Sequence, residues 1–287
     1  MSTLIDLRRR IRSIRNSQQV TQAMKTVSTA KFRKAQRAVF ESRPYWHSFP
    51  DLMARMVFWA GEDAHPLLAA REEKKIAVLV VASDKGLAGA FNSNLLIQTS
   101  AFLREKAGTS EVRLLLVGKK AANFFRKTNY AVDITYGDKT DRLTGEEKAR
   151  LAGAVMSKYV FHKIDAVYAA YNEFKSIVSS KITIEKILPL DFKPVDGNSL
   201  EWPPDWEPEA AGLLRTLLPL YVESRIHHAL SESQAAEQAA RMMAMDTATQ
   251  NAEELITDMT LLLNKIRQAS ITKELLEIMT AVEALAK

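Results

Sequence analysis

Glycine and proline are absent from both ends of this chain, and that absence limits its fold more than any other feature. All ten Gly and all nine Pro lie between Pro44 and Pro219 of the 287 residues. Because these two residues are the strongest helix breakers, both ends are free to form single uninterrupted helices. At about 1.5 Å per residue the ends would reach roughly 64 Å and 100 Å. A compact globule of this chain length is roughly 50 Å across, so we expect such helices to project.

The apolar residues near the C-terminus repeat at alternating spacings of three and four, which is typical of a coiled-coil seam. The predicted seam consists of Met245, Ala248, Ala252, Leu255, Met259, Leu262, Ile266 and Ala269. After a slip in phase it continues through Ile271, Leu275, Ile278, Val282 and Leu285. A slip of this kind changes the local winding or the partner of the helix.

The N-terminal end carries two apolar arcs that lie on nearly opposite sides of a helix. The first arc consists of Leu4, Leu7, Ile11 and Ile14, and the second of Val20, Ala23, Met24 and Val27. Supercoil drift of about 20° per heptad does not produce such a jump. We therefore expect this helix to meet different surfaces along its length.

The formal net charge of +6 is a property of one end of the chain. Residues 1–43 hold eleven basic and two acidic side chains, whereas residues 220–287 hold six basic and ten acidic ones. Opposite charge and a chain that returns through the middle predict antiparallel pairing of the two ends. The C-terminal end is longer, so part of its apolar stripe stays uncovered, which usually marks an interaction site. A helical bundle folded back on itself is the alternative, although no Gly or Pro turn follows Pro219.

The middle of the chain alternates strand-like and helix-like segments. Strands are expected at residues 76–82, 112–117, 131–136, 165–171 and 181–188, and helices at 92–106, 119–127 and from Thr144 to about His162. Thr144 and Glu147 form a capping box for the last of these helices. This order predicts an α/β fold with a Rossmann-like, mostly parallel sheet. The predicted organisation is an N-terminal coiled-coil helix at 1–55, the α/β domain at 74–191, a Pro-rich linker at 192–219 and a C-terminal coiled-coil helix at 220–287.

No motif in the chain predicts a catalytic, cofactor-binding or metal-binding site. The absence of Cys excludes disulfides, thiolate nucleophiles and Cys-ligated metals. The loop with Gly86 and Gly89 follows the first strand, where doubly wound folds bind ligands. It matches neither phosphate-binding fingerprint, so we interpret it as a tight structural turn, with a ligand loop as the alternative. His227 and His228 are adjacent and point about 100° apart on a helix, so they do not suit one metal.

The basic cluster at residues 8–15 has several interpretations. Nucleic-acid binding, an anionic membrane surface and an Arg-rich transit peptide are alternatives to the solvated, partner-facing side of a coiled-coil arm. No aromatic residue occurs before Phe32, which weakens the case for single-strand binding. We favour the coiled-coil arm. The longest strictly apolar run, residues 76–82, is far below the roughly 20 residues that a membrane span needs.

Three blocks of sequence resemble the gamma subunits of F-type ATP synthases, and the resemblance covers essentially the whole chain. The blocks are residues 7–16 (LRRRIRSIRN) with 22–31 (QAMKTVSTAK), residues 83–95 (SDKGLAGAFNSNL), and residues 237–245 (EQAARMMAM) with 264–278 (NKIRQASITKELLEI). The last block resembles the C-terminal signature of that family. Ala281 and Val282 stand where the family usually has Gly-Ala, which affects packing near the tip.

The resemblance implies a central rotor shaft of proton-translocating ATP synthase, with no catalytic site and no cofactor of its own. Its implied partners are the alpha and beta subunits in an alternating hexamer, the epsilon subunit and the ring of c subunits, and no nucleic acid. Proton flow would turn the ring and the shaft and drive the catalytic beta subunits through their affinity states. By resemblance, the shaft meets the alpha/beta ring at Met24, Lys25, Arg241, Gln268, Thr272 and Glu274.

The resemblance also gives expectations about location. The match begins near Thr3 and the chain lacks Cys, which favours a bacterial relative over mitochondrial or thiol-regulated chloroplast ones. A bacterial protein of this kind would be a peripheral subunit on the cytoplasmic side of the inner membrane. Two other classes stay open on sequence alone. One is a nucleic-acid-binding coiled-coil adaptor, for which DNA affinity would depend steeply on salt. The other is a Rossmann-domain enzyme, for which the isolated chain would bind nucleotide.

Overall fold

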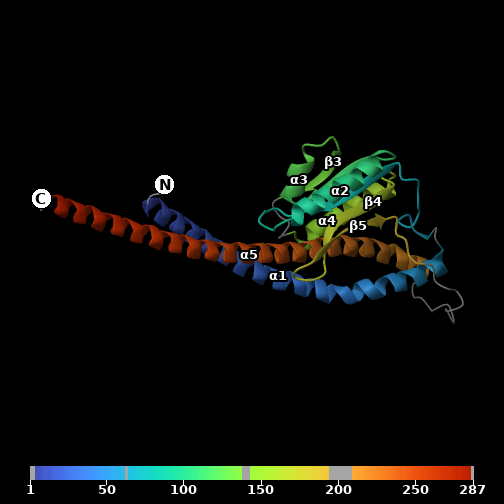
Figure 1. The fold of residues 1–287 in the computed structure, drawn as a ribbon. Helices are drawn as coiled ribbons and strands as arrows, with labels where there is room; N and C mark the ends of the chain where they lie inside the picture. Colours follow the sequence, from blue (N-terminus) through green and yellow to red (C-terminus); the bar gives the residue numbers. More distant parts are fainter. Residues whose placement is uncertain (1–3, 62–63, 138–142, 194–208, 286–287) are drawn as a thin grey trace. The chain divides into compact units, whose positions relative to one another are not determined.

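Two very long helices begin and end the fold. The computed structural model describes residues 4–61, 64–137, 143–193 and 209–285. Helix α1 spans Leu4–Ala60 and helix α5 spans Ala210–Leu285 (Figure 1). The prediction of a long helix at each end is confirmed.

Each of the two helices contributes to two compact units. The body unit consists of residues 29–241, and the stalk unit consists of residues 1–28 and 242–287. The body unit therefore holds the second part of α1, the sheet and the first part of α5. The described residues of the stalk unit, 4–28 and 242–285, are all helical.

Helix α1 extends past Pro44 and Pro50 and ends at a glycine. Gly61 has φ +86°, and its N–H donates to the Val57 carbonyl at 2.8 Å. A residue with positive φ just after the last turn is a common helix stop, because glycine has no Cβ to strain in that conformation. The helix therefore ends a few residues beyond the predicted boundary at residue 55.

Helix α5 begins inside the segment that the sequence predicted to be a linker. Pro219 lies within the helix, although a proline removes one hydrogen bond at a cost of about 3 kcal/mol. Leu214 and Leu218 are completely buried in the body unit. Their burial offsets that cost, since each large apolar side chain contributes about 1.5–3 kcal/mol. The predicted helix start at residue 220 is thus corrected to Ala210, and residues 194–208 of the predicted linker lie outside the described residues.

The body unit contains one five-stranded sheet. Its strands are β1 (Lys75–Val81), β2 (Glu111–Val117), β3 (Ala131–Tyr136), β4 (Ala166–Phe174) and β5 (Ser180–Leu188). Their order is β3-β2-β1-β4-β5, and all neighbours are parallel except β4 and β5. This confirms the predicted mostly parallel, Rossmann-like sheet, to which β5 adds an antiparallel edge.

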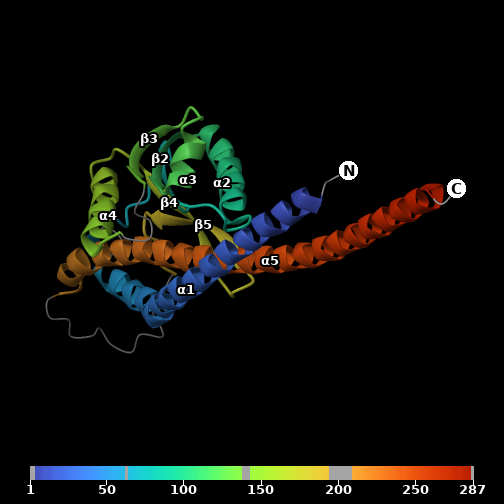
Figure 2. The ribbon, with the colours of Figure 1, turned by 90° about the vertical axis from the view of Figure 1, so that its left-hand side faces the viewer.

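Helices cover both faces of the sheet. Helices α2 (Phe91–Ala107) and α3 (Lys119–Phe125) lie on one side, and α4 (Gly145–Val160) lies on the other (Figure 2). The capping box predicted for α4 is present, with the Thr144 side chain accepting from the Glu147 N–H and the Glu147 carboxylate accepting from the Thr144 N–H.

Strand β1 is buried from both sides, which explains its continuous apolar sequence. Ala77, Leu79 and Val81 belong to the core beneath α4, α1 and α5, and the alternate residues of β1 belong to the core beneath α2 and α3. Gly118, with φ +95°, ends β2 at the carboxyl edge of the sheet. A Cβ there would lie 2.2 Å from the Ala82 carbonyl oxygen, so the backbones can approach this closely only at a glycine.

Candidate functional site

The residues that the sequence assigned to a partner-contact site fall in both units. Arg241 belongs to the body unit, and the other five belong to the stalk unit. The predicted site residues are therefore described unit by unit.

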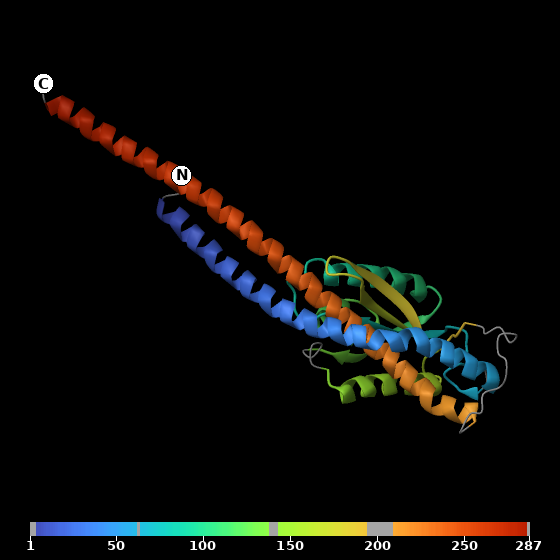
Figure 3. The same ribbon diagram turned by 90° about the horizontal axis from the view of Figure 1, so that it is seen from below.

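In the stalk unit, the first part of α1 lies beside α5 and runs antiparallel to it, and the last turns of α5 extend past the start of α1 (Figure 3). The Thr21 and Thr249 hydroxyls are 2.8 Å apart, and Lys25 Nζ donates to Asp246 Oδ1 at 2.6 Å. An increase in residue number along α1 thus corresponds to a decrease along α5. The predicted antiparallel pairing of the two ends is confirmed in this unit.

The register of the stalk seam differs from the one that the apolar pattern predicted. Met245, Ala248, Ala252, Met259 and Ile266 are buried or half-buried as predicted, but Leu255, Leu262 and Ala269 are exposed. The buried or half-buried side chains of α5 in this segment are Met245, Asp246, Ala248, Thr249, Ala252, Ile256, Met259, Leu263, Asn264, Ile266 and Ser270. The prediction was wrong at three positions where it followed apolar residues only, because the neighbouring Ile256, Leu263 and Ser270 are the less exposed residues. The Thr21 contact compensates Thr249 for its lost hydration.

Lys25 is thus an internal contact of the stalk as well as a predicted partner contact. Its ammonium and the Asp246 carboxylate are each about one-third exposed. Met24, its neighbour, is half-buried. The sequence analysis did not single out Asp246, although a carboxylate at a seam position opposite a basic arm is the signal that would have found it.

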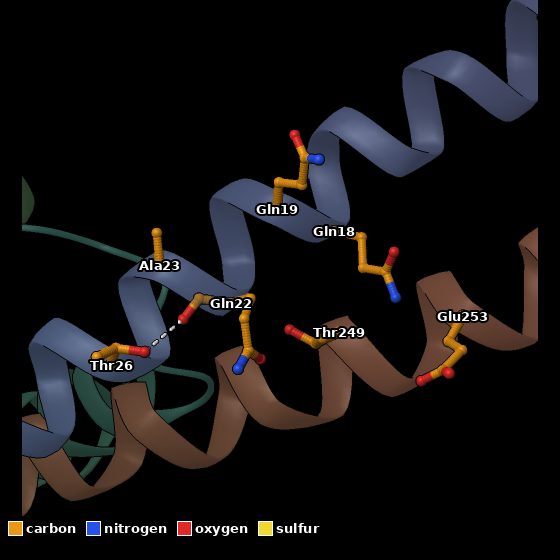
Figure 4. A pocket seen from close by; sticks show the side chains of 7 residues that line it. All are labelled: Gln18, Gln19, Gln22, Ala23, Thr26, Thr249 and Glu253. Carbon is orange, nitrogen blue, oxygen red and sulfur yellow. Dashed lines mark hydrogen bonds between the residues drawn. The ribbon is translucent and has the colours of Figure 1, made fainter.

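A polar groove of about 550 Å³ lies next to this seam (Figure 4). It is lined by Gln18, Gln19, Gln22, Ala23, Thr26, Thr249 and Glu253. The Thr26 hydroxyl donates to the Gln22 carbonyl at 3.1 Å, whereas the amide ends of Gln18 and Gln22 are directed toward α5. The groove offers donors and acceptors beside Met24 and Lys25 but only one titratable side chain, so it suits polar contacts better than acid–base chemistry.

Beyond the paired part of the stalk, α5 has large apolar side chains on its surface. Gln268, Thr272 and Glu274 are all exposed, and the Thr272 hydroxyl donates to the Gln268 carbonyl at 3.0 Å. The exposed apolar side chains of this segment are Ile271, Leu275, Leu276, Ile278, Met279 and Val282. The predicted uncovered stripe is thus present, and three predicted site residues lie within or next to it.

Arg241 is bound inside the body unit. Its Nη2 donates to Glu237 Oε1 at 2.6 Å and to the Lys85 carbonyl at 3.3 Å, and its Nε donates to the Gly86 carbonyl at 3.3 Å. The residue is only 6% exposed. The guanidinium therefore fastens the loop after β1 to α5, because its planar donors satisfy two backbone carbonyls and a carboxylate at once.

The same loop is held by its own polar contacts. The Asn92 side chain accepts from the Ser83 N–H at 3.1 Å, and Asp84 Oδ1 accepts from the Lys119 N–H at 3.0 Å. Leu87 has φ +62° and is exposed. A pocket of about 500 Å³ lies between this loop, α2 and α3. The contacts agree with the interpretation of the loop as a fixed structural turn.

The adjacent histidines have different neighbours, as the sequence predicted. His227 Nε2 lies 2.9 Å from Lys148 Nζ, whereas His228 Nε2 lies 3.8 Å from the Glu232 carboxylate and its ring packs against Tyr171. Burial, opposed by Glu173 and reinforced by Arg43, lowers the pKa of His228 to about 4. Within the described residues, no group of three or more His, Asp or Glu side chains could hold a metal ion.

A two-helix antiparallel stalk joined to a Rossmann-like body defines the class of shaft-like stalk proteins. The family model described as ATP synthase matches residues 3–285. ATP synthase gamma chains of Solibacter usitatus and Pelotomaculum thermopropionicum are 43% and 41% identical, with 99% of this chain covered in both cases and 99% and 100% of the relatives. The chain belongs to the family of ATP synthase gamma chains.

Solved structures have the same fold. A chain in the mitochondrial ATP synthase of Euglena gracilis matches with a TM-score of 0.70 and 20% identity over 98% of this chain and 94% of its own length. A chain in the central stalk and c-ring structure of the Tetrahymena thermophila enzyme matches with a TM-score of 0.62 and 23% identity, over 80% and 99%. Among the described helices, none combines the length and apolarity that a membrane crossing requires.

Proposed function

We propose that this chain is the central rotor shaft of an ATP synthase and couples rotation of a c-ring, driven by proton flow, to ATP synthesis or hydrolysis on alpha and beta subunits. The observation that carries the proposal is the last part of α5, where six large apolar side chains are exposed between residues 271 and 282. A soluble protein rarely exposes such a stripe unless a partner covers it. The names of the relatives and of the solved assemblies, which include F1 and the c-ring, support an ATP synthase assembly as the source of that partner.

In this proposal the shaft has no catalytic site of its own. Rotation requires a stiff element and a surface that does not lock to one partner state. Uninterrupted helix supplies stiffness, and the mixture of exposed Ile, Leu, Thr and Glu side chains supplies a surface of uneven chemistry. ATP would bind to the partner subunits, while the epsilon subunit and the c-ring would contact the body unit. The location would be the cytoplasmic side of a bacterial inner membrane, as a peripheral subunit.

We further propose that Met24, Lys25, Gln268, Thr272 and Glu274 contact the alpha/beta ring directly. All five lie in the stalk unit, and the last three are exposed. Arg241 would contribute to the interface indirectly, because its donors already bind Glu237 and the loop at Lys85 and Gly86. Its part in the interface would be to hold that loop in a fixed position.

Reconstitution tests the proposal as a whole. The full chain is mixed with an alpha/beta preparation, and ATPase activity and co-elution are measured. Stimulated ATPase activity together with co-elution is the expected result. A chain that binds neither subunit, or that co-elutes without any change in ATPase activity, would contradict the proposal.

A matched pair of threonines tests the contact residues. Thr272 and Thr257 are both exposed on α5, and each hydroxyl donates to the carbonyl four residues earlier at 3.0 Å. Thr272→Ala and Thr257→Ala should therefore each change the stability of the isolated chain by no more than about 0.5 kcal/mol. We expect only Thr272→Ala to lower ATPase stimulation, by several-fold. Equal stimulation by the two variants would remove Thr272 from the contact site.

A further inference from the structure

Three side chains form a hydrogen-bonded row between α4 and α5 in the body unit, apart from the surfaces discussed above. Lys148 Nζ on α4 lies 2.9 Å from His227 Nε2 on α5. His227 Nδ1 lies 3.4 Å from the hydroxyl of Ser231, one turn further along α5. Lys148 is half-buried and His227 is exposed, so a small molecule can reach the row from solvent.

The hydrogen-bonding capacity of these groups limits their protonation as long as Lys148 is charged. A lysine ammonium has donors only, so His227 Nε2 accepts from Lys148 in that state. The imidazole is then neutral and carries its proton on Nδ1, where it donates to the Ser231 hydroxyl. The ring is therefore held with a basic nitrogen directed at the lysine.

Lys148 is hydrogen-bonded to an imidazole, whereas Lys158 and Lys106 of the body unit are paired with carboxylates. Lys158 on the same helix is paired with Asp133, and Lys106 with Glu73. Among the described residues, Lys148 has no carboxylate partner, and a carboxylate is what would hold its proton in place. Burial lowers the pKa of Lys148, and burial followed by the Lys148 charge lowers the pKa of His227. Both directions make the deprotonated amine and the neutral imidazole easier to reach than in isolated side chains.

We propose that Lys148 is an acylation site for small activated acyl groups such as acyl phosphates, with His227 as the base and Ser231 as the group that orients it. A nucleophile within hydrogen-bond distance of a base, which a third group orients, is the arrangement that activates nucleophiles in covalent catalysis. In this chain the same arrangement would activate Lys148 to become modified itself, because no residue that would transfer the acyl group onward is proposed.

The chemical step balances without a further reactant. The ammonium of Lys148 first loses one proton to solvent, and the Nζ lone pair then attacks the carbonyl carbon of the acyl phosphate. A new C–N bond forms, and the C–O bond to phosphate breaks with its electron pair leaving on phosphate. His227 Nε2 takes the second proton from the attacking nitrogen and passes it to solvent. The product is a neutral amide, so the modification removes the positive charge at this point between α4 and α5.

The test measures acylation of each lysine in the full chain incubated with acetyl phosphate. Site-resolved mass spectrometry gives the initial rate at Lys148, at the carboxylate-paired Lys158 of the same helix and at the exposed Lys163. We expect Lys148 to react about tenfold faster than either control, which is less than the roughly 100-fold or more that a positioned base typically contributes in an enzyme. A rate at Lys148 equal to or below that of Lys163 would overturn the proposal without any variant.

Two variants separate base assistance from simple accessibility. His227→Gln keeps a polar side chain but removes the base, and it should lower the Lys148 rate about tenfold while the Lys163 rate stays unchanged. Ser231→Ala should lower it less, because it removes only the orienting contact. An unchanged Lys148 rate in His227→Gln would overturn the proposal. A small neutral acetyl thioester as donor distinguishes general base assistance, in which Lys148 is again preferred, from a preference for the phosphate leaving group alone.

Discussion

At the residue scale, Glu232 shows how α1 and α5 are attached to the sheet within the body unit. Its carboxylate accepts from the Phe174 N–H at 2.9 Å and lies 3.6 Å from Arg43 Nη2, while another Arg43 contact reaches the Phe174 carbonyl at 3.1 Å. The residue is 1% exposed. One buried acid thus joins both long helices to the end of β4.

Removing that acid should be costly because the Phe174 N–H stays buried. Glu232→Ala leaves this N–H without its acceptor and removes the ion-pair partner of Arg43, which keeps only the Phe174 carbonyl, and we expect a loss of about 2–4 kcal/mol in the free energy of unfolding. Glu232→Gln keeps an acceptor oxygen and should lose less. Urea unfolding of both variants measures the difference, with Glu277→Gln on the exposed part of α5 as control. Equal losses in the Ala and Gln variants would show that charge, not the hydrogen bond, matters.

Glu73 gives a pH-dependent prediction. Its carboxylate accepts from Lys106 at 2.8 Å, from Lys186 at 2.6 Å and from the Tyr168 hydroxyl at 2.8 Å. Burial raises the pKa of Glu73, but these hydrogen bonds outweigh it and lower the pKa to about 2. Because the folded-state pKa is lowered, the stabilisation is present above the unfolded value of 4.5 and is lost as the pH falls toward about 2.

Glu73→Gln should therefore destabilise the protein by about 1 kcal/mol at pH 6, after allowance for solvent screening. The difference from the wild type should shrink by pH 3, since the variant does not titrate at this position. Glu72→Gln is the matched control, because the neighbouring Glu72 side chain is mostly exposed. Urea unfolding at the two pH values checks this. A difference that stays constant between them would contradict the assignment.

At the element scale, the two long helices show what a sequence pattern can and cannot specify. Their existence was predictable, because helix breakers are confined to one region and apolar residues repeat with a helical period. The seam register was not, because Thr249 occupies an inward position and Leu255 an outward one. An apolar count cannot detect a seam position held by a hydroxyl pair such as Thr21 and Thr249.

The start of α1 supplies a matched test of that seam. Leu7 is 3% exposed and Ile5, two residues earlier, is 67% exposed. Leu7→Ala should cost about 2–3 kcal/mol locally, since it removes a buried side chain from the stalk unit, whereas Ile5→Ala should be nearly neutral. Hydrogen exchange of the first turns of α1 measures the effect. Similar exchange in the two variants would show that α5 does not hold this end.

The start of α5 shows a second limit of sequence patterns. Pro219 is a strong signal for a helix boundary, so the sequence predicted that α5 begins after it. The helix begins earlier because Leu214 and Leu218 are buried, and this burial depends on tertiary packing that the local sequence does not show. The strands, by contrast, were predicted to within three residues at each end. Buried parallel strands are continuous apolar runs, so local sequence alone identifies them.

At the scale of the whole molecule, the division of charge between the two ends contributes less to pairing than the sequence suggested. Lys25 pairs with Asp246 in the stalk unit and Arg43 with Glu232 in the body unit, whereas Arg9 and Arg12 are exposed. Buried side chains such as Leu7 and Met245 supply most of the seam. The charge difference is thus better suited to recognition and solubility than to stability, because exposed ion pairs contribute little.

Part of the predicted contact site could be placed from the sequence, and part of it depends on tertiary contacts. The exposed positions of Gln268, Thr272 and Glu274 agree with a contact surface that the family resemblance implied. The internal contacts of Arg241 could not be predicted, because its acceptors Lys85 and Gly86 are far away in the sequence. Only the fold brings a loop after β1 beside the middle of α5.

Truncation after Ile271 tests whether the exposed end of α5 is needed to transmit torque. The side chains of residues 272–282 are all exposed, so their removal should change the unfolding free energy of the isolated chain by no more than about 0.5 kcal/mol. The paired seam and the body unit are left intact, so the truncated chain should still co-elute with alpha and beta subunits. It should stimulate their ATPase activity less and produce less torque, because the uneven apolar surface is gone.

A shorter truncation after Thr280 is the graded control for this experiment, since it keeps Leu275 and Ile278, which the longer truncation removes. We expect it to retain more stimulation than the longer truncation. Failure of the longer form to assemble at all would mean that the exposed end of α5 holds the complex together. In that case the stripe would be an anchor, and torque would have to pass through the paired seam around Thr21 and Lys25 instead.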